Sequence, residues 1–171
     1  NRSDPTRPAV NSNSWGGGIV GTITVAFGSV ADAGIFAVAS AGNTNNGGPH
    51  WPASYTTVLS VQAMNLGDNR SGFATFNTDT DVGTPGREIV QGWRGGTLGW
   101  GDGSSPAAAL GSAAAACFLQ GYANLENATN ASVNMKTWMA TPGSGCLDNV
   151  VIGTLVNGTS TKMVWLGRRG N

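Results

Sequence analysis

Two short segments of this chain contain the residue types that acyl-transfer chemistry uses. Ala39–Asn43 (ASAGN) is an apolar run that ends in an amide side chain. Gly103–Ala108 (GSSPAA) opens an alanine-rich segment of helical character. A serine exposed at a helix start can act as a nucleophile, and an asparagine amide can donate a hydrogen bond to the oxyanion that the attack creates. The two segments therefore predict part of a serine-dependent acyl-transfer site.

Ser105 has two interpretations. As a nucleophile at a helix N-terminus, it would gain from the helix dipole and from the free backbone N–H groups of the first turn. Pro106 suits the first helical position, where no N–H is needed. Alternatively, Ser105 only caps a buried helix, because serine is a preferred N-cap residue. The residues alone leave both interpretations open.

The chain contains one histidine, His50, as a candidate general base. A base must reach the serine hydroxyl at hydrogen-bond distance. His50 lies in the loop sequence GGPHWP, and we interpret it as a surface-loop residue rather than the base. An α/β-hydrolase nucleophile elbow is disfavoured as well, since Ala107 stands where a second glycine is needed and no histidine follows.

Composition limits the function classes. The 171 residues suffice for one domain with a core. Nine basic and nine acidic residues balance, and only 11% of the residues are charged, so no electrostatic footprint for nucleic acid or an anionic membrane is present. No apolar run approaches the length of about 18 residues that a membrane span needs.

The chain contains two cysteines and five N-glycosylation sequons. Cys117 and Cys146 form neither a disulfide framework nor a metal site, so free thiols and a single bridge both stay open. We interpret Cys117 as a small buried hydrophobe, because it lies in an apolar segment. The low charge and the sequons together favour a secreted glycoprotein. The sequons start at Asn1, Asn69, Asn127, Asn130 and Asn157.

Predicted strands and helices alternate along the chain. The patterns predict a strand at 9–15, a helix over 19–34 and a buried strand at 35–39, an order that indicates an α/β crossover unit. The alanine-rich helix at 105–120 is expected to be buried around most of its circumference. Residues 1–8 are interpreted as a linker or extended arm, followed by one domain over 9–171. The other predicted elements are strands at 58–63, 73–76, 88–90 and 162–166 and a helix at 132–140.

In this order, the motifs resemble those of the subtilisin-like serine peptidases (subtilases), including the proteinase K branch. The resemblance covers roughly residues 9–167, and its specificity comes from the order and spacing of the motifs rather than from any single one. The motifs are Asn13–Gly17, Ala39–Asn43, Trp51–Ser54, Val58–Val61, Ser71–Asn77, Gly83–Gly86, the segment from Gly95 to Ala109, Asn157–Thr159 and Met163–Trp165.

The resemblance implies a fold, an activity and a set of site residues. It implies a three-layer α/β fold with a mostly parallel sheet, whose N-terminal strands are missing from this chain, and a serine endopeptidase that acts on polypeptides. Ser105 would be the nucleophile and Asn43 the oxyanion donor. Because the nucleophile segment matches the family without a gap, we favour this role of Ser105 over a helix cap, and Ser105 over its neighbour Ser104. A turn role for Asn43 and a buried indole for Trp15 are the alternatives. The implied substrate-binding residues are Ser14, Trp15 and Gly16, along the substrate backbone, and Ala39, Ser40, Ala41 and Gly42, along the primary specificity pocket.

The chain departs from the family pattern at several points. The family's catalytic Asp and His motifs lie upstream of where this chain starts, and neither motif occurs here. The proline of the family's nucleophile motif is replaced by Ala109, and a following glycine by Ala113. The resemblance also places His50 away from the nucleophile.

These departures leave two hypotheses. In the first, the N-terminal half of the catalytic domain, on the same or a separate chain, supplies Asp and His, and this chain alone is inactive. In the second, the protein is a non-catalytic subtilase-like binding or structural module of a larger assembly. We expect no cofactor and no metal among the site residues, and the sequence leaves structural calcium open.

Overall fold

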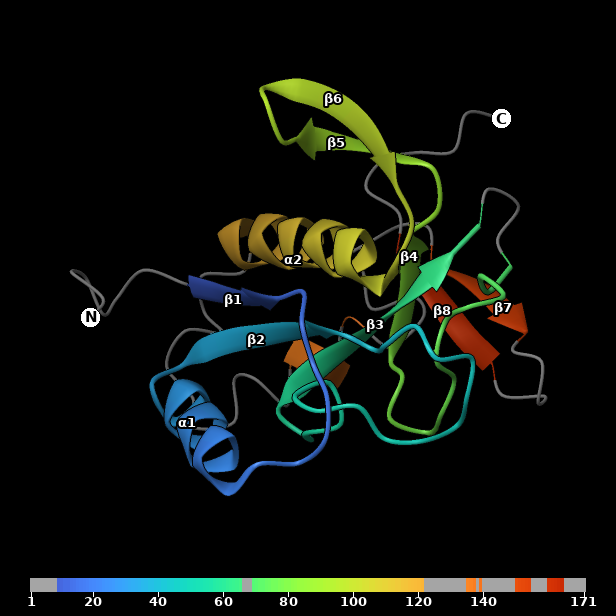
Figure 1. The fold of residues 1–171 in the computed structure, drawn as a ribbon. Coiled ribbons are helices and arrows are strands. Elements are labelled where there is room, and N and C mark those ends of the chain that lie inside the picture. Colours follow the sequence, from blue (N-terminus) through green and yellow to red (C-terminus); the bar gives the residue numbers. More distant parts are fainter. Residues whose placement is uncertain are drawn as a thin grey trace.

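The computed structural model describes residues 9–65, 69–121, 135–137, 139, 150–154 and 160–164. Their centre is a six-stranded sheet with the order β1-β2-β3-β4-β8-β7 (Figure 1). Neighbouring strands pair in parallel from β1 to β8, and only β7 runs antiparallel to its neighbour. The predicted mainly parallel α/β fold is confirmed. The strands of the sheet are β1 Ala9–Asn13, β2 Ile35–Ser40, β3 Val58–Met64, β4 Val82–Pro85, β7 Val150–Thr154 and β8 Ser160–Val164.

Two helices, α1 (Gly21–Asp32) and α2 (Ser104–Gly121), cover opposite faces of this sheet (Figure 1). Successive side chains of a strand point to opposite faces. Accordingly, Phe36 and Val38 of β2 pack in the cluster that contains the alanines of α2. The alternate residues Ala37 and Ala39 pack with Phe27 of α1 instead. The helix–sheet–helix order gives the three layers.

The two central strands are buried on both faces. All seven residues of β3 and five of the six residues of β2 are buried. Their apolar runs are what a parallel sheet between two helical layers requires. Predicted strands at 35–39 and 58–63 are confirmed for this reason.

The helix α2 is buried on one side only, so the expectation of burial around most of its circumference is wrong. Its small residues let it approach β3 closely: a Cβ built on Gly111 would lie 2.9 Å from Val61 Cγ2. The outer side carries Leu110 and Cys117, which are exposed. The interpretation of Cys117 as a buried hydrophobe is therefore wrong, since its helical position faces away from the sheet. Cys146 lies outside the described residues.

The predicted strand at 73–76 is also wrong. These residues bond to a loop instead of a strand: Thr75 N donates to Gly42 O over 3.0 Å, and Phe76 N donates to Asn46 O over 2.8 Å. The sheet contains the strand Val82–Pro85 instead, which the sequence pattern did not indicate. The predicted strand at 88–90 is part of a two-stranded antiparallel hairpin, β5 (Ile89–Trp93) and β6 (Thr97–Gly101), that lies above α2 in Figure 1.

The remaining predictions are met at altered boundaries. The first helix begins at residue 21 rather than 19, and Phe27 is its one buried residue. Residues 135–137 and 139 are helical, as expected for the helix at 132–140. The closing strand begins at Ser160 rather than at 162. The predicted arm at residues 1–8 lies outside the described residues.

Candidate active site

Ser105 lies in the first turn of α2, beside the end of β1. Its hydroxyl donates a hydrogen bond to the carbonyl oxygen of Ser14 over 2.9 Å. The Ser14 hydroxyl in turn donates to the carbonyl oxygen of Ser105 over 2.9 Å. Ser105 is half-buried, whereas its neighbour Ser104 is buried and the Ser104 hydroxyl accepts from Gly42 N over 3.2 Å. Of the two serines, Ser105 is thus the one that solvent can reach.

Asn43 lies against the same helix start. Its side-chain oxygen Oδ1 accepts from Ser104 N over 2.8 Å. Because the oxygen is used in this way, the amide nitrogen Nδ2 is left to donate elsewhere. Gly42 precedes it with a φ of 104°, a conformation that side chains rarely adopt. The ASAGN segment therefore turns sharply at the end of β2 and presents an amide donor near Ser105.

The parallel sheet explains why these residues meet. Asn13 and Ala39 are neighbours in the register of β1 and β2, so the segments that follow them leave the sheet at the same edge. Gly103 N donates to Gly86 O over 2.8 Å, which ties the start of α2 to the end of β4 at this edge as well. The carboxyl ends of parallel strands are where α/β folds bind ligands.

The residues predicted to bind substrate differ in exposure. Ser14, Trp15 and Gly16 are exposed, and 48% of the Trp15 surface is accessible to solvent. The Trp15 ring contacts the Phe27 ring edge-on, with 6.3 Å between the ring centroids. The alternative of a buried indole is therefore wrong. The residues Ala39, Ser40, Ala41 and Gly42 are buried, and the Ala39 side chain belongs to the core beneath α1. The two sets lie side by side, and their roles toward a substrate stay predictions.

His50 lies in a loop, as predicted, and this loop contacts two of the predicted substrate-binding residues. The half-buried ring of His50 lies against Gly16 and Gly42. Partial burial lowers the pKa of His50 below its ordinary value, which favours the neutral ring. No hydrogen bond joins this ring to Ser105 in the described part of the chain. The sequence carried no local signal for this position of the ring, because it depends on the pairing of Trp51, the residue after His50, with Gly17.

The described residues contain no group of three or more His, Cys, Asp or Glu side chains that could hold a metal ion. Within the same residues, no helix is long and apolar enough to cross a membrane.

The profile of the subtilase family matches residues 2–159. The chain belongs to the subtilase family. Proteinase R from Parengyodontium album is 29% identical over 157 residues, which are 91% of this chain and 39% of that protein. The subtilisin-like serine protease AsES from Sarocladium strictum is 32% identical over 139 residues, 80% of this chain and 36% of that protein.

A solved structure agrees with the fold of this subtilase chain. The crystal structure of a cold-adapted subtilisin-like serine proteinase superposes with a TM-score of 0.76 at 23% identity, over 95% of this chain and 56% of the other. This chain therefore spans less than two fifths of the length of the two curated relatives and a little more than half of the solved structure.

Proposed function

We propose that the protein is a serine endopeptidase in which Ser105 is the nucleophile and Asn43 is an oxyanion donor. The observation that carries the proposal is the meeting of both residues at the start of α2, with the Asn43 amide oriented by Ser104 N. The profile match of the subtilase family supports the reaction class.

In the proposed reaction, Ser105 Oγ attacks the carbonyl carbon of the scissile peptide bond and loses its proton to a histidine base. The negative charge that develops on the carbonyl oxygen is stabilised by Asn43 Nδ2 and by the backbone N–H of Ser105. The protonated histidine then gives its proton to the leaving amine as the C–N bond breaks. Water hydrolyses the acyl-enzyme by the same steps. Peptide, water and protein groups balance the reaction without a cofactor.

We further propose that the N-terminal half of the catalytic domain, on the same or a separate chain, supplies the histidine and its aspartate. Two observations support this. The chain spans only 39% and 36% of the first two relatives. In the described sheet, β1 is an edge strand whose free side can pair with a further strand.

Labelling with a fluorophosphonate tests the proposal. The probe should modify Ser105 in the native full-length protein, as read by peptide mass spectrometry, and it should not modify a Ser105→Ala variant. The variant Ser104→Ala is a matched control that should still be labelled. Absence of labelling in a sample shown to contain the upstream Asp and His would contradict the proposed peptidase.

A second candidate function is a non-catalytic subtilase-like binding or structural module. It is favoured by one observation: the Ser105 hydroxyl donates to the Ser14 carbonyl rather than to a base. The full-length sequence separates the two candidates. Upstream Asp and His motifs support the peptidase, and their replacement supports the module.

We also propose that the protein is a secreted glycoprotein. The low charge and the five sequons support this, and Asn69, which starts a sequon within the described residues, is exposed. Export of the protein from expressing cells, together with a mass shift on treatment with a glycan-removing amidase, is the expected result.

A further inference from the structure

The ring of His50 fills the space that two glycines face. A Cβ built on Gly16 would lie 2.3 Å from His50 Nε2, and one built on Gly42 would lie 3.1 Å from His50 Cγ. These distances are shorter than ordinary van der Waals contact, so the ring touches both backbones. One edge of the ring meets the segment after β1, and the other edge meets the segment after β2.

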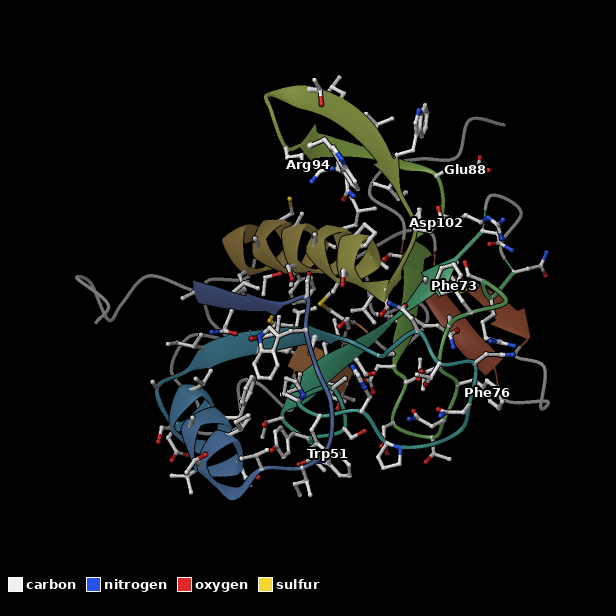
Figure 2. All side chains as sticks on the ribbon, viewed as in Figure 1. Trp51, Phe73, Phe76, Glu88, Arg94 and Asp102 are labelled. Atoms are coloured by element: carbon white, nitrogen blue, oxygen red, sulfur yellow. The ribbon has the colours of Figure 1, made fainter. Side chains whose placement is uncertain are left out.

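The backbone holds the ring in this position. Gly17 N donates to Trp51 O over 2.8 Å, and Trp51 N donates to Gly17 O over 2.9 Å. These bonds fix His50 beside Gly16, and Figure 2 shows Trp51 next to the loop that leads into α1. On the other side, His50 N donates to Ser54 Oγ over 3.0 Å, and Ser54 N donates to His50 O over 3.0 Å. These four hydrogen bonds hold the backbone of the loop on both sides of His50, and the ring projects from this backbone between Gly16 and Gly42.

Because the His50 ring lies beside the two segments that flank Ser105, it can affect which substrates fit the site. Ser14 contacts Ser105 on one side, and Asn43 contacts the same helix turn on the other. A substrate carbonyl attacked by Ser105 Oγ from about 3–3.5 Å therefore lies between the two segments that these residues belong to. A side chain on the acyl side of that carbonyl that enters the space between the segments would meet the His50 ring, which lies against Gly16 and Gly42 there.

We propose that His50 closes this space and restricts the residue on the acyl side of the scissile bond to alanine, glycine or serine. The inference rests on the proposed peptidase function and adds the substrate class to it. A ring in van der Waals contact with two backbones excludes a large side chain by volume. One methylene more or less in a hydrophobic pocket already changes kcat/KM by roughly 10- to 200-fold, so the exclusion of an aromatic side chain should change it by about tenfold or more.

Cleavage of a matched pair of tetrapeptide p-nitroanilides, which differ only in alanine or phenylalanine as the last residue, tests the inference. The full-length protein should favour the alanine substrate by about tenfold or more. The variant His50→Ala should raise kcat/KM for the phenylalanine substrate at least tenfold relative to the alanine substrate. Leu98→Ala on the exposed β6 strand is the control, and its substrate ratio should equal that of the wild type.

Several results would overturn the inference. They are equal wild-type rates on both substrates, a wild-type preference for a carboxylate side chain at the same position, or an unchanged ratio in His50→Ala. Where His50→Ala does not fold, the wild-type ratio and a His50→Ser variant decide. Labelling with a small fluorophosphonate that has no peptide side chain separates failure of the peptidase function from failure of the proposed role of His50. Labelled Ser105 with the wrong substrate ratio overturns only the role of His50, whereas unlabelled Ser105 overturns the peptidase and this inference together.

Discussion

Ser105 and Ser14 exchange two hydrogen bonds, each 2.9 Å long, although 91 positions separate them in the chain. Each hydroxyl donates to the backbone carbonyl of the other residue. The pair therefore fixes the first turn of α2 against the end of β1. It sets the distance between the proposed nucleophile and the segment predicted to run along the substrate.

Replacing Ser14 by alanine should lower stability slightly and leave catalysis almost unchanged. The substitution removes the bond from the Ser14 hydroxyl but keeps the carbonyl that accepts from Ser105, because that carbonyl is backbone. The expected loss is about 0.5–1.5 kcal/mol of unfolding free energy, measured by denaturant titration. Ser29→Ala is the control, since its hydroxyl bonds only to its own helix. A drop in kcat of tenfold or more for Ser14→Ala would show that the hydroxyl itself takes part in the reaction.

Replacing Asn43 by alanine should lower kcat by about 10²–10³ with little change in KM, because the amide contacts the oxyanion only in the transition state. The measurement is steady-state peptide hydrolysis by the full-length protein. Asn46→Ala is a matched control in the same exposed loop, where Asn46 Oδ1 accepts only from Gly48 N at 3.3 Å. An equal effect of both substitutions on kcat would assign Asn43 a turn role.

Asp81 and Lys136 form a mostly buried ion pair at 3.0 Å, with side-chain exposures of 15% and 17%. Burial raises the pKa of Asp81, while Lys136 and the bond from Ser60 N act against that rise. Lys136→Met leaves the carboxylate buried without its cation, which should cost about 3 kcal/mol of unfolding free energy at pH 7.

The cost of Lys136→Met should depend on pH. Without the cation, the pKa of Asp81 in the folded protein rises further above its unfolded value. The penalty is then present above that raised pKa, and it decreases as falling pH protonates the carboxyl group. The double variant Asp81→Asn/Lys136→Met buries no charge and should show little of this dependence. Thermal melts of both variants and the wild type between pH 4 and 8 measure this pH dependence. A loss of stability in Lys136→Met that grows toward acid pH would contradict the prediction.

The sequence predicted the elements whose pattern is local. The local sequence is enough to predict β2, β3 and α2. The continuous apolar runs of β2 and β3 indicate strands buried on both faces, and the alanine content of α2 indicates a helix. The nucleophile and oxyanion segments follow directly from the ends of these elements. Their meeting at one edge of the sheet follows from parallel pairing.

The features that depend on distant partners were missed. Residues 73–76 alternate like a strand, but their backbone groups bond to the loop that contains Gly42 and Asn46. The strand Val82–Pro85 has too few apolar residues to be recognised, and its place beside β3 comes from the register of Val61 with Val82. His50 reaches the site only because Trp51 pairs with Gly17, far away in the sequence.

Gly86 connects the end of β4 to the nucleophile segment, and alanine there should harm both stability and activity. A Cβ on Gly86 would lie 2.6 Å from the Cβ of Ala63 and 2.7 Å from the carbonyl oxygen of Gly103. Both neighbours are rigid, so the start of α2 must shift, at a cost of about 1–3 kcal/mol. The shift also weakens the 2.8 Å bond from Gly103 N to Gly86 O that positions the turn before Ser105.

The matched control for Gly86→Ala is Gly92→Ala on β5, where a Cβ would meet nothing within 4 Å. The control should change the melting temperature and kcat little. Gly86→Ala should lower the melting temperature and, at temperatures where it is still fully folded, lower kcat as well, because a small misplacement of the nucleophile costs rate. Fluorophosphonate labelling rates of Ser105 in both variants report on this placement directly. Equal labelling rates would mean that β4 supports the fold without positioning the nucleophile.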